Sequence, residues 1–277
     1  MERKKMNNPS VFSGTADTFS RRIIPVVLTV IAVVFITAGT WSCSAKNAKL
    51  AGLHLDKGVT YIQQGQYTFA LRELLEAKKL NPDDPVIRYY LGISYHGKRL
   101  IPEAVTEFKE AIQIKPDYSD AHNYLGTVYS DMGRWDEAIE EFNLAVSNIL
   151  YETPAGALNN MGYAYYKKGD YQTALSKYDE ALKREPTTLL VPLIEKNRGI
   201  TYFARGKFHE SVSHLKKSLA EAPDFAESRY WLARCYLELK NPNAAKEEFL
   251  AVVKIAPDSE FGVRSRTALE AIAAGSR

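Results

Sequence analysis

The stretch GYAYYKKGDYQTALSKYDEALKREP, which runs from Gly162 to Pro186, decides the fold of this chain of 277 residues. Apolar residues recur at helical spacing on both sides of Gly169, so the stretch predicts two short amphipathic helices joined by a tight turn. A proline cannot continue a helical hydrogen-bond ladder, so we expect Pro186 to end the second helix. Small and aromatic residues hold fixed places in this hairpin, namely Gly162, Tyr165, Ala174, Tyr178 and Ala181.

The same places recur along the chain. A Gly or Ala followed three residues later by Tyr occurs six times, at spacings of 34, 34, 36, 37 and 34 residues. The six pairs are Gly58/Tyr61, Gly92/Tyr95, Gly126/Tyr129, Gly162/Tyr165, Gly199/Tyr202 and Ala233/Tyr236. A helical hairpin with this period resembles the tetratricopeptide repeat. We therefore expect an all-α fold, a right-handed α-solenoid of six hairpins with a concave and a convex side and a C-terminal capping helix.

The repeated residues have packing roles that can be anticipated. We expect the small residue of each pair, and the Ala twelve residues after it, to let the two helices of a hairpin approach closely, because a larger side chain there would cost about 1–3 kcal/mol. We expect the bulky residue sixteen positions after each pair's first member to fill the space between hairpins. Prolines are expected to close the units at Pro82, Pro116, Pro154 (displaced from the period), Pro186, Pro223 and Pro257.

The periodicity predicts the domain boundaries. Residues 1–42 form a membrane-targeting leader, 43–50 a lipidated N-terminus and tether, 51–259 the repeats, and 260–277 a capping helix and tail. The six repeats span 51–84, 85–118, 119–154, 155–191, 192–225 and 226–259. The third repeat is two residues longer than the period and three extra residues follow the fourth, which is compatible with an altered superhelical path or with neutral length drift.

The leader carries the net charge of the chain. Residues 1–42 hold five basic and two acidic residues, which equals the total of +3, so the remainder is about neutral and nucleic-acid binding has no electrostatic support. Arg21 and Arg22 precede an uncharged run over residues 23–41, as in a secretory signal. The residues around Cys43 partly resemble a bacterial lipobox, which implies lipidation of Cys43 and, with Ser44 after it, the outer membrane.

Two other interpretations of the leader stay open. The uncharged run is long enough to span a bilayer as an uncleaved inner-membrane signal anchor, or cleavage could follow near Ala45. The lipoprotein and anchor interpretations both place residues 46–277 in the periplasm, with the membrane as a partner through the anchor.

The sequence contains no recognisable catalytic motif. It has no P-loop, no H-E-x-x-H, no G-x-S-x-G and no Gly-rich dinucleotide turn. Its two cysteines make no disulfide framework, its five histidines lack metal-ligand spacing, and Cys235 is expected to be a buried, inert thiol. We therefore expect a protein that is not an enzyme and that has no cofactor, no metal and no small-molecule substrate.

A protein-binding groove is the expected functional site. In tetratricopeptide proteins one face of each first helix lines the concave side, and carried onto this chain that face combines tyrosines and aliphatic residues with a central polar zone. The predicted groove residues are Tyr89, Ile93, His96, Asn123, Thr127, Asn159, Asn160, Tyr163, Tyr166, Lys196, Ile200, Phe203, Tyr230 and Arg234. As a set they predict a peptide or protein ligand with apolar side chains, and the asparagines are candidates for hydrogen bonds to its backbone. Packing of the superhelix is the alternative role for each single residue.

The combination of leader, repeats and cap resembles one family of envelope proteins, the type IV pilus biogenesis lipoproteins or PilF/PilW-type pilotins. The most similar portion runs from Thr153 through Ala164 into the Lys-Lys-Gly-Asp-Tyr turn. The resemblance implies an outer-membrane lipoprotein that binds pilus secretin subunits and helps them assemble. The alternative is a general envelope scaffold, for example in exopolysaccharide export or the docking of envelope enzymes.

Overall fold

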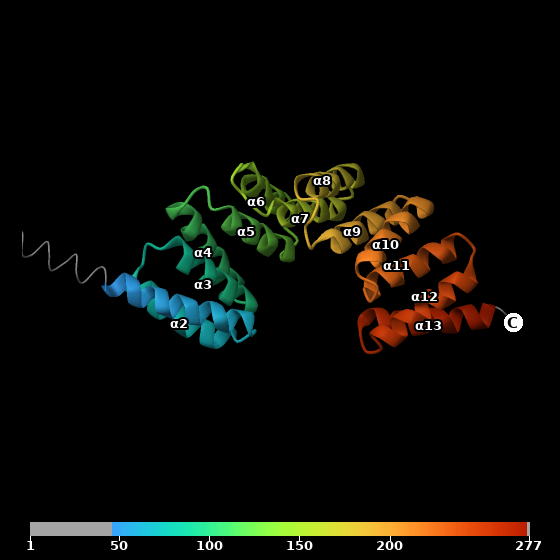
Figure 1. The fold of residues 1–277 in the computed structure, drawn as a ribbon, viewed down its shortest axis with the longest axis horizontal. Helices are drawn as coiled ribbons and strands as arrows, with labels where there is room; N and C mark the ends of the chain where they lie inside the picture. The colour runs from blue at the N-terminus through green and yellow to red at the C-terminus, as the bar shows by residue number, and fades with distance from the viewer. Residues whose placement is uncertain (1–45, 276–277) are drawn as a thin grey trace, which may run out of the picture. The chain divides into compact units, whose positions relative to one another are not determined.

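The computed structural model describes residues 46–275 (Figure 1). Within this range the chain is helical and contains no strand, as expected. It divides between Asp83 and Asp84 into two compact parts, which we call unit 1 and unit 2. No helix within residues 46–275 has both the length and the apolar character needed to cross a membrane. The predicted leader and the predicted lipidation site Cys43 lie outside the described residues.

Unit 1 contains a single hairpin. A helical stretch over residues 46–63 is joined to α2 (Tyr67–Leu80) by a turn in which Gly65 has φ of +70°, a conformation that favours glycine. Leu74 of α2 is fully buried and lies against Gly58 of the first helix. Unit 1 is therefore one complete repeat of the predicted kind.

Unit 2 contains five hairpins and a final helix. Its helices are α3 (Pro85–Gly97), α4 (Ile101–Ile114), α5 (Ser119–Asp131), α6 (Trp135–Ser147), α7 (Pro154–Lys167), α8 (Tyr171–Arg184), α9 (Val191–Ala204), α10 (Phe208–Glu221), α11 (Ala226–Glu238), α12 (Pro242–Ile255) and α13 (Glu260–Gly275). Consecutive pairs from α3/α4 to α11/α12 form the hairpins.

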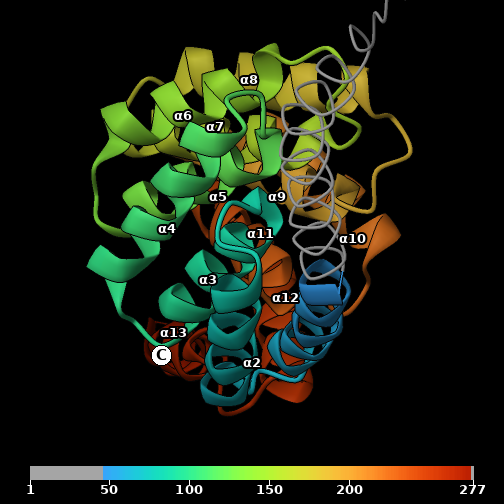
Figure 2. The same ribbon diagram turned by 90° about the vertical axis from the view of Figure 1, so that its left-hand side faces the viewer.

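The hairpins of unit 2 stack so that the first helix of each hairpin lies on one side and the second helix on the other. Each second helix packs on the first helix of the following hairpin, and successive first helices (α3, α5, α7, α9 and α11) also contact one another. Among residues 46–275 the backbones of successive second helices do not approach one another in this way, and α8 reaches α6 through a side chain, with Arg184 donating to the carbonyl of Val146 at 3.1 Å. Figures 1 and 2 show α6 and α8 lying outside α5 and α7. First helices therefore line the inner face of unit 2, as the sequence predicts.

The small residue of each pair permits a close helix contact, but its partner differs from the predicted one. A Cβ added to Gly162 would lie 2.5 Å from a ring carbon of Tyr178, the residue sixteen positions later in the same hairpin. Gly92 meets Phe108 and Gly126 meets Phe142 in the same way. The bulky residue at this position thus lies directly over the glycine within its own hairpin, and the prediction that it acts mainly between hairpins needs this correction.

One repeat boundary is also wrong in the prediction. Pro154 does not close the third repeat, because α6 already ends at Ser147 and Pro154 is the first residue of α7. A proline is well placed there, since the first N–H of a helix has no intrahelical partner. Residues 148–153 form the longer connection that the sequence indicated.

The final helix covers the last hairpin. Phe261, Leu269 and Ile272 of α13 pack with the buried Phe249 and Val252 of α12. The expected capping helix is therefore present.

A charged pair joins the two helices of most hairpins at a sequence separation of 19 residues. In residues 46–275 these pairs are His54–Glu73 (2.8 Å), Arg88–Glu107 (3.3 Å), His122–Glu141 (2.7 Å), Glu195–His214 (2.6 Å) and Arg229–Glu248 (2.8 Å). In the α7/α8 hairpin the same positions hold Leu158 and Lys177. Three of the five histidines of the chain are therefore held by carboxylates that recur with the repeat.

Candidate functional site

All fourteen predicted groove residues lie on the first helices of unit 2, and most of them reach solvent. Tyr163 is the most exposed, at 42%. Half-buried side chains are those of Tyr89, Ile93, His96, Asn123, Thr127, Asn160, Tyr166, Ile200, Phe203 and Arg234. Asn159, Lys196 and Tyr230 are buried instead, so these three do not form part of an open groove.

Burial of Lys196 and Tyr230 has clear structural causes. The ammonium of Lys196 lies 2.8 Å from the carboxylate of Glu227 on the next first helix, which compensates its charge. The ring of Tyr230 packs at a tilt against Phe249 and Phe261. Lys196 joins two hairpins and Tyr230 joins the last hairpin to α13, so for both the packing alternative applies.

The predicted polar zone is a chain of side-chain amides. Asn197 of α9 donates to Asn159 of α7 at 2.8 Å, and Asn159 donates to its neighbour Asn160 at 3.4 Å. Asn160 then donates to the amide oxygen of Asn123 on α5, also at 3.4 Å, and Asn123 donates to the hydroxyl of Tyr151. The chain spans three first helices, so these amides bind one another before any ligand. Only Asn123 and Asn160 retain partial exposure for a peptide backbone.

An aromatic surface lies beside the amide chain, on the α7/α8 hairpin and the start of α6. We call it the tyrosine patch, and it consists of Trp135, Tyr163, Tyr166 and Tyr171. The rings of Tyr163 and Tyr166 stack at 6.2 Å, Trp135 meets Tyr163 at 6.3 Å, and Tyr166 meets Tyr171 at 5.7 Å. Burial, with the nearby Tyr171 and Tyr163, raises the pKa of Tyr166, so its phenol stays uncharged at neutral pH.

Trp135 and Tyr171 were missed by sequence reasoning. They lie on second helices at the first helical residue, whereas the prediction considered first helices alone. An aromatic residue directly after the hairpin turn was the available signal, and Phe208 occupies the same place in the next hairpin.

Two further aromatic groups flank the tyrosine patch on unit 2. Towards α3, Tyr89 contacts Tyr124 and Phe108, and His96 lies 3.0 Å from Asp131. Towards α11, the guanidinium of Arg234 lies over the rings of Phe203 and Trp231, at 5.4 and 5.9 Å from their centroids. Cation–π contacts of this kind hold the cation in place while leaving its hydrogen-bond donors available.

No group suited to metal chemistry occurs among residues 46–275, where no three His, Cys, Asp or Glu side chains come close enough to hold an ion. Cys235 is buried, as predicted, with its sulfur 3.0 Å from the hydroxyl of Ser211. Burial is the main reason why its pKa is raised to about 11, so the thiol stays protonated.

Comparison with family models assigns the repeats. Models described as tetratricopeptide repeat match residues 117–185, 153–220 and 202–262, and a model described as TPR repeat matches residues 58–98. These matches together cover more than half of the chain, over the same segments that fold into hairpins. The chain belongs to the tetratricopeptide repeat family. Tetratricopeptide arrays are protein-interaction scaffolds and are generally not enzymes.

Curated relatives match over single segments of the array. A TPR repeat-containing thioredoxin, TTL4, of Arabidopsis thaliana is 31% identical over 97 residues, which cover 35% of this chain and 14% of the relative. The photosystem I assembly protein Ycf3 of Synechococcus sp. (strain CC9605) is 32% identical over 78 residues, covering 26% of this chain and 45% of the relative. The chain thus spans less than half the length of either relative.

Solved structures match over most of the array. PilW, described as a widely conserved type IV pilus biogenesis factor, is 21% identical, with a TM-score of 0.71 over 77% of this chain and 97% of PilW. PilF of Pseudomonas aeruginosa is 14% identical, with a TM-score of 0.69 over 80% of this chain and 99% of PilF. The Cut9–Hcn1 tetramer of the APC/C has a TM-score of 0.67 at 17% identity, over 83% of this chain and 46% of the matched chain. At these identities the likeness is one of fold.

Proposed function

We propose that this protein is a non-enzymatic periplasmic lipoprotein that captures a protein client through the inner face of its array. The proposed client is the subunit of the type IV pilus secretin, whose assembly in the outer membrane the protein assists. The tyrosine patch is the observation that carries the binding proposal. The match in fold with PilW and PilF, over nearly the whole of each, supports the choice of client.

The tyrosine patch has the physical properties of a binding hot spot. Its rings are aligned by one another, so little side-chain entropy remains to be lost on binding. Tyrosine and tryptophan supply large apolar surfaces with a polar end, and a few such residues carry most of the energy of protein interfaces. An apolar segment of the client is expected to pack on Tyr163 and Tyr166, with the partly exposed amides of Asn123 and Asn160 at its side.

Lipidation of Cys43 supplies the location in this proposal. Several acyl chains on one N-terminus give durable membrane attachment, since each buried CH₂ contributes about 0.8 kcal/mol. Labelling of cells with radioactive palmitate tests it: the unchanged protein should incorporate label, and Cys43→Ser should not. A protein that takes up no label would instead fit the uncleaved signal anchor.

Photo-cross-linking in living cells tests the client. A benzoylphenylalanine placed at Tyr163 should give a cross-linked product containing the secretin subunit. The matched control places the same group at Asn143, an exposed residue of α6. Secretin products of equal yield at both positions, or none at Tyr163, would overturn the proposal. Products with exopolysaccharide-export proteins or envelope enzymes would favour the scaffold alternative, which the similar fold of Cut9–Hcn1 keeps relevant.

The contribution of the tyrosine patch to the binding free energy can then be measured with the purified protein and the purified secretin subunit. Tyr163→Ala combined with Tyr166→Ala should weaken binding by about 2–4 kcal/mol if the patch is the hot spot. Unchanged affinity with an unchanged circular dichroism spectrum would place the client elsewhere. Because Trp135 contacts Tyr163, its fluorescence provides a direct signal of occupancy.

A further inference from the structure

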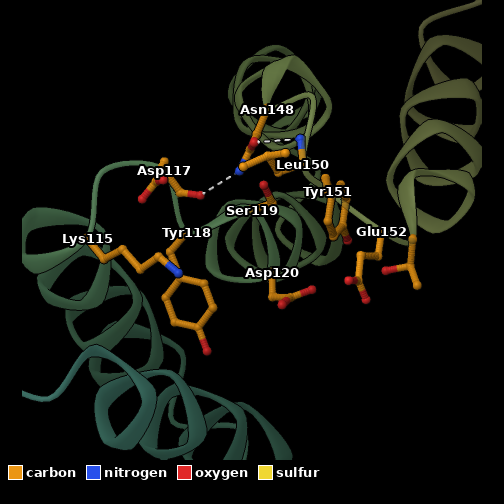
Figure 3. A pocket seen from close by; sticks show the side chains of 10 residues that line it. Lys115, Asp117, Tyr118, Ser119, Asp120, Asn148, Leu150, Tyr151 and Glu152 are labelled. Atoms are coloured by element: carbon orange, nitrogen blue, oxygen red, sulfur yellow. Dashed lines mark hydrogen bonds between the residues drawn. The ribbon is translucent and has the colours of Figure 1, made fainter.

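The longer connection between α6 and α7, residues 148–153, forms one wall of a hollow that the proposed function does not use. The hollow has a volume of ≈ 430 Å³, and its other wall is the turn from α4 to α5 (Figure 3). The residues that line it are Lys115, Asp117, Tyr118, Ser119, Asp120, Asn148, Leu150, Tyr151, Glu152 and Thr153. It lies wholly within unit 2.

The hollow is built by specific contacts. The side-chain amide of Asn148 donates to the backbone carbonyl of Asp117 at 3.1 Å, and its oxygen accepts from the backbone N–H of Leu150 at 2.9 Å (Figure 3). The backbone N–H of Tyr151 donates to the carbonyl of Asn148, and the Tyr151 hydroxyl accepts from Asn123. The connection is therefore fixed to both neighbouring elements, and the hollow is formed before any ligand arrives.

Three carboxylates, which can only accept hydrogen bonds, line the hollow. Asp117, Asp120 and Glu152 are exposed carboxylates that form no salt bridge within the described part of the chain. Lys115 is the one cation of the lining, and its ammonium lies over the ring of Tyr118, 5.0 Å from the centroid. Burial raises the pKa of Tyr118 and of Tyr151, and the negative charge of Asp120 raises both pKa values further. The carboxylate of Asp120 therefore makes the electrostatic potential in the hollow more negative.

Ser119 provides an independent sign of a binding site. Its side chain is only 6% exposed, and its hydroxyl has no hydrogen-bond partner in the structure. A buried unpaired hydroxyl costs free energy, so such groups in folded proteins are usually paired. Figure 3 shows Ser119 at the centre of the lining, between Asn148 and Asp120.

The rim of the hollow is apolar. Ile149 and Leu150 are 94% and 81% exposed, among the most exposed large hydrophobic side chains of residues 46–275. Exposed apolar residues beside a charged hollow fit a ligand that places an apolar group next to a charged one.

We propose that this hollow binds a lysine or arginine side chain of a protein partner, whose apolar neighbours pack on Ile149 and Leu150. An ammonium or guanidinium group supplies only donors, which matches the carboxylates of Asp120 and Glu152 and the free hydroxyl of Ser119. A bare metal ion fits less well, since no group of three potential ligands occurs in the described residues. The site is separate from the tyrosine patch and does not depend on the function proposed for it.

Fluorescence anisotropy with a defined probe tests the proposal. The probe is a labelled, capped peptide with lysine between two leucines, and its control carries acetyl-lysine in place of lysine. The protein is the full-length chain in lipid nanodiscs. The lysine peptide should bind about tenfold more tightly than the control, because acetylation removes a charge-assisted bond. Equal binding of the two peptides would overturn the proposal.

Variants locate the binding. Asp120→Asn with Glu152→Gln should abolish the preference for lysine, whereas the matched control, Asp258→Asn with Glu247→Gln, removes two exposed carboxylates elsewhere and should retain it. Ser119→Ala should weaken peptide binding several-fold without lowering the melting temperature, because its hydroxyl makes no bond in the folded chain. A loss of binding in the control pair, or displacement of the peptide by millimolar calcium chloride, would contradict the assignment.

Discussion

The side-chain amide of Asn197 on α9 donates a hydrogen bond to the amide oxygen of Asn159 on α7, over 2.8 Å between nitrogen and oxygen. Both residues are buried, and Asn159 is only 4% exposed. A buried amide that lost its partner would keep the cost of its removal from water, so the bond favours one arrangement of the two hairpins. These two asparagines of the polar zone therefore stabilise the packing of the hairpins.

Replacing Asn197 with alanine should destabilise the array. The amide oxygen of Asn159 would lose its partner in a buried place, at a cost of about 1–3 kcal/mol in the free energy of unfolding. Urea unfolding followed by circular dichroism measures it. Asn143→Ala, on an exposed part of α6, is the control and should change stability by less than about 0.5 kcal/mol. Equal effects of the two substitutions would mean that the amide bond contributes nothing.

A methyl group added at Gly162 should be tolerated poorly, in contrast to one added at Gly156 of the same helix. At Gly162 the new Cβ would come within 2.5 Å of the Tyr178 ring, which is itself fully packed, so Gly162→Ala should cost about 1–3 kcal/mol. At Gly156 the nearest atom is 3.8 Å away, on Leu190, and Gly156→Ala should stabilise α7 by about 0.5–1 kcal/mol. Thermal unfolding of both variants gives the comparison, and melting temperatures that move in the same direction would refute this explanation.

The fold could be predicted from the sequence because its determinants are local and periodic. A glycine that must meet a bulky side chain sixteen residues later, as Gly162 meets Tyr178, appears at the same spacing in five hairpins, and Ala233 takes its place in the last. The expectation that a proline closes each repeat was wrong once, at Pro154, which is the first residue of α7. In the sequence, a proline that follows one helix cannot be told from a proline that starts the next helix when the connection between them is longer than usual.

The candidate site could be predicted only in part. The predicted first-helix face included Tyr163 and Tyr166, but the contact of Tyr163 with Trp135 depends on the packing of neighbouring hairpins. The bond between Asn159 and Asn197 joins residues 38 apart, and no short-range pattern distinguishes an asparagine that pairs with another from one that faces a ligand. The burial of Asn159 and Asn197 could therefore be learned only from the structure.

The thiol of Cys235 should be unreactive in the folded protein. Its pKa is raised to about 11, first because it is buried, so only about one thiol in a thousand is ionised near pH 8. Iodoacetamide should alkylate Cys235 only after urea is added, as measured by mass spectrometry of the peptide that contains it. Rapid alkylation without denaturant would show that α11 opens readily. The control is a free cysteine introduced at the exposed Asn143, which should react at once.

The His122–Glu141 pair should make stability depend on pH. Both ring nitrogens of His122 face acceptors, the carboxylate of Glu141 at 2.7 Å and the carbonyl of Pro116 at 3.0 Å, so both bonds form only when the ring is protonated. Burial lowers the pKa of His122, but these two bonds outweigh it and the pKa is raised above its ordinary value of 6.5. The stabilisation from this pair is fully present below pH 6.5, the ordinary pKa of histidine. It is lost as the pH rises through the raised pKa of His122 in the folded protein.

Glu195 should make the free energy of unfolding depend on pH at the acidic end of the range. Burial raises the pKa of this carboxyl, but the hydrogen bond from His214 and the charge of Arg198 outweigh burial and bring the pKa below 4.5. Its contribution is therefore present above 4.5 and is lost on acidification. Unfolding free energies measured between about pH 4 and pH 8 for the unchanged protein, His122→Gln and Glu195→Gln separate the two effects. The deficit of His122→Gln should shrink as the pH rises from 6 to 8, and that of Glu195→Gln should shrink as the pH falls to about 4. Deficits that stay constant over the whole range would mean that neither pair contributes through its charge.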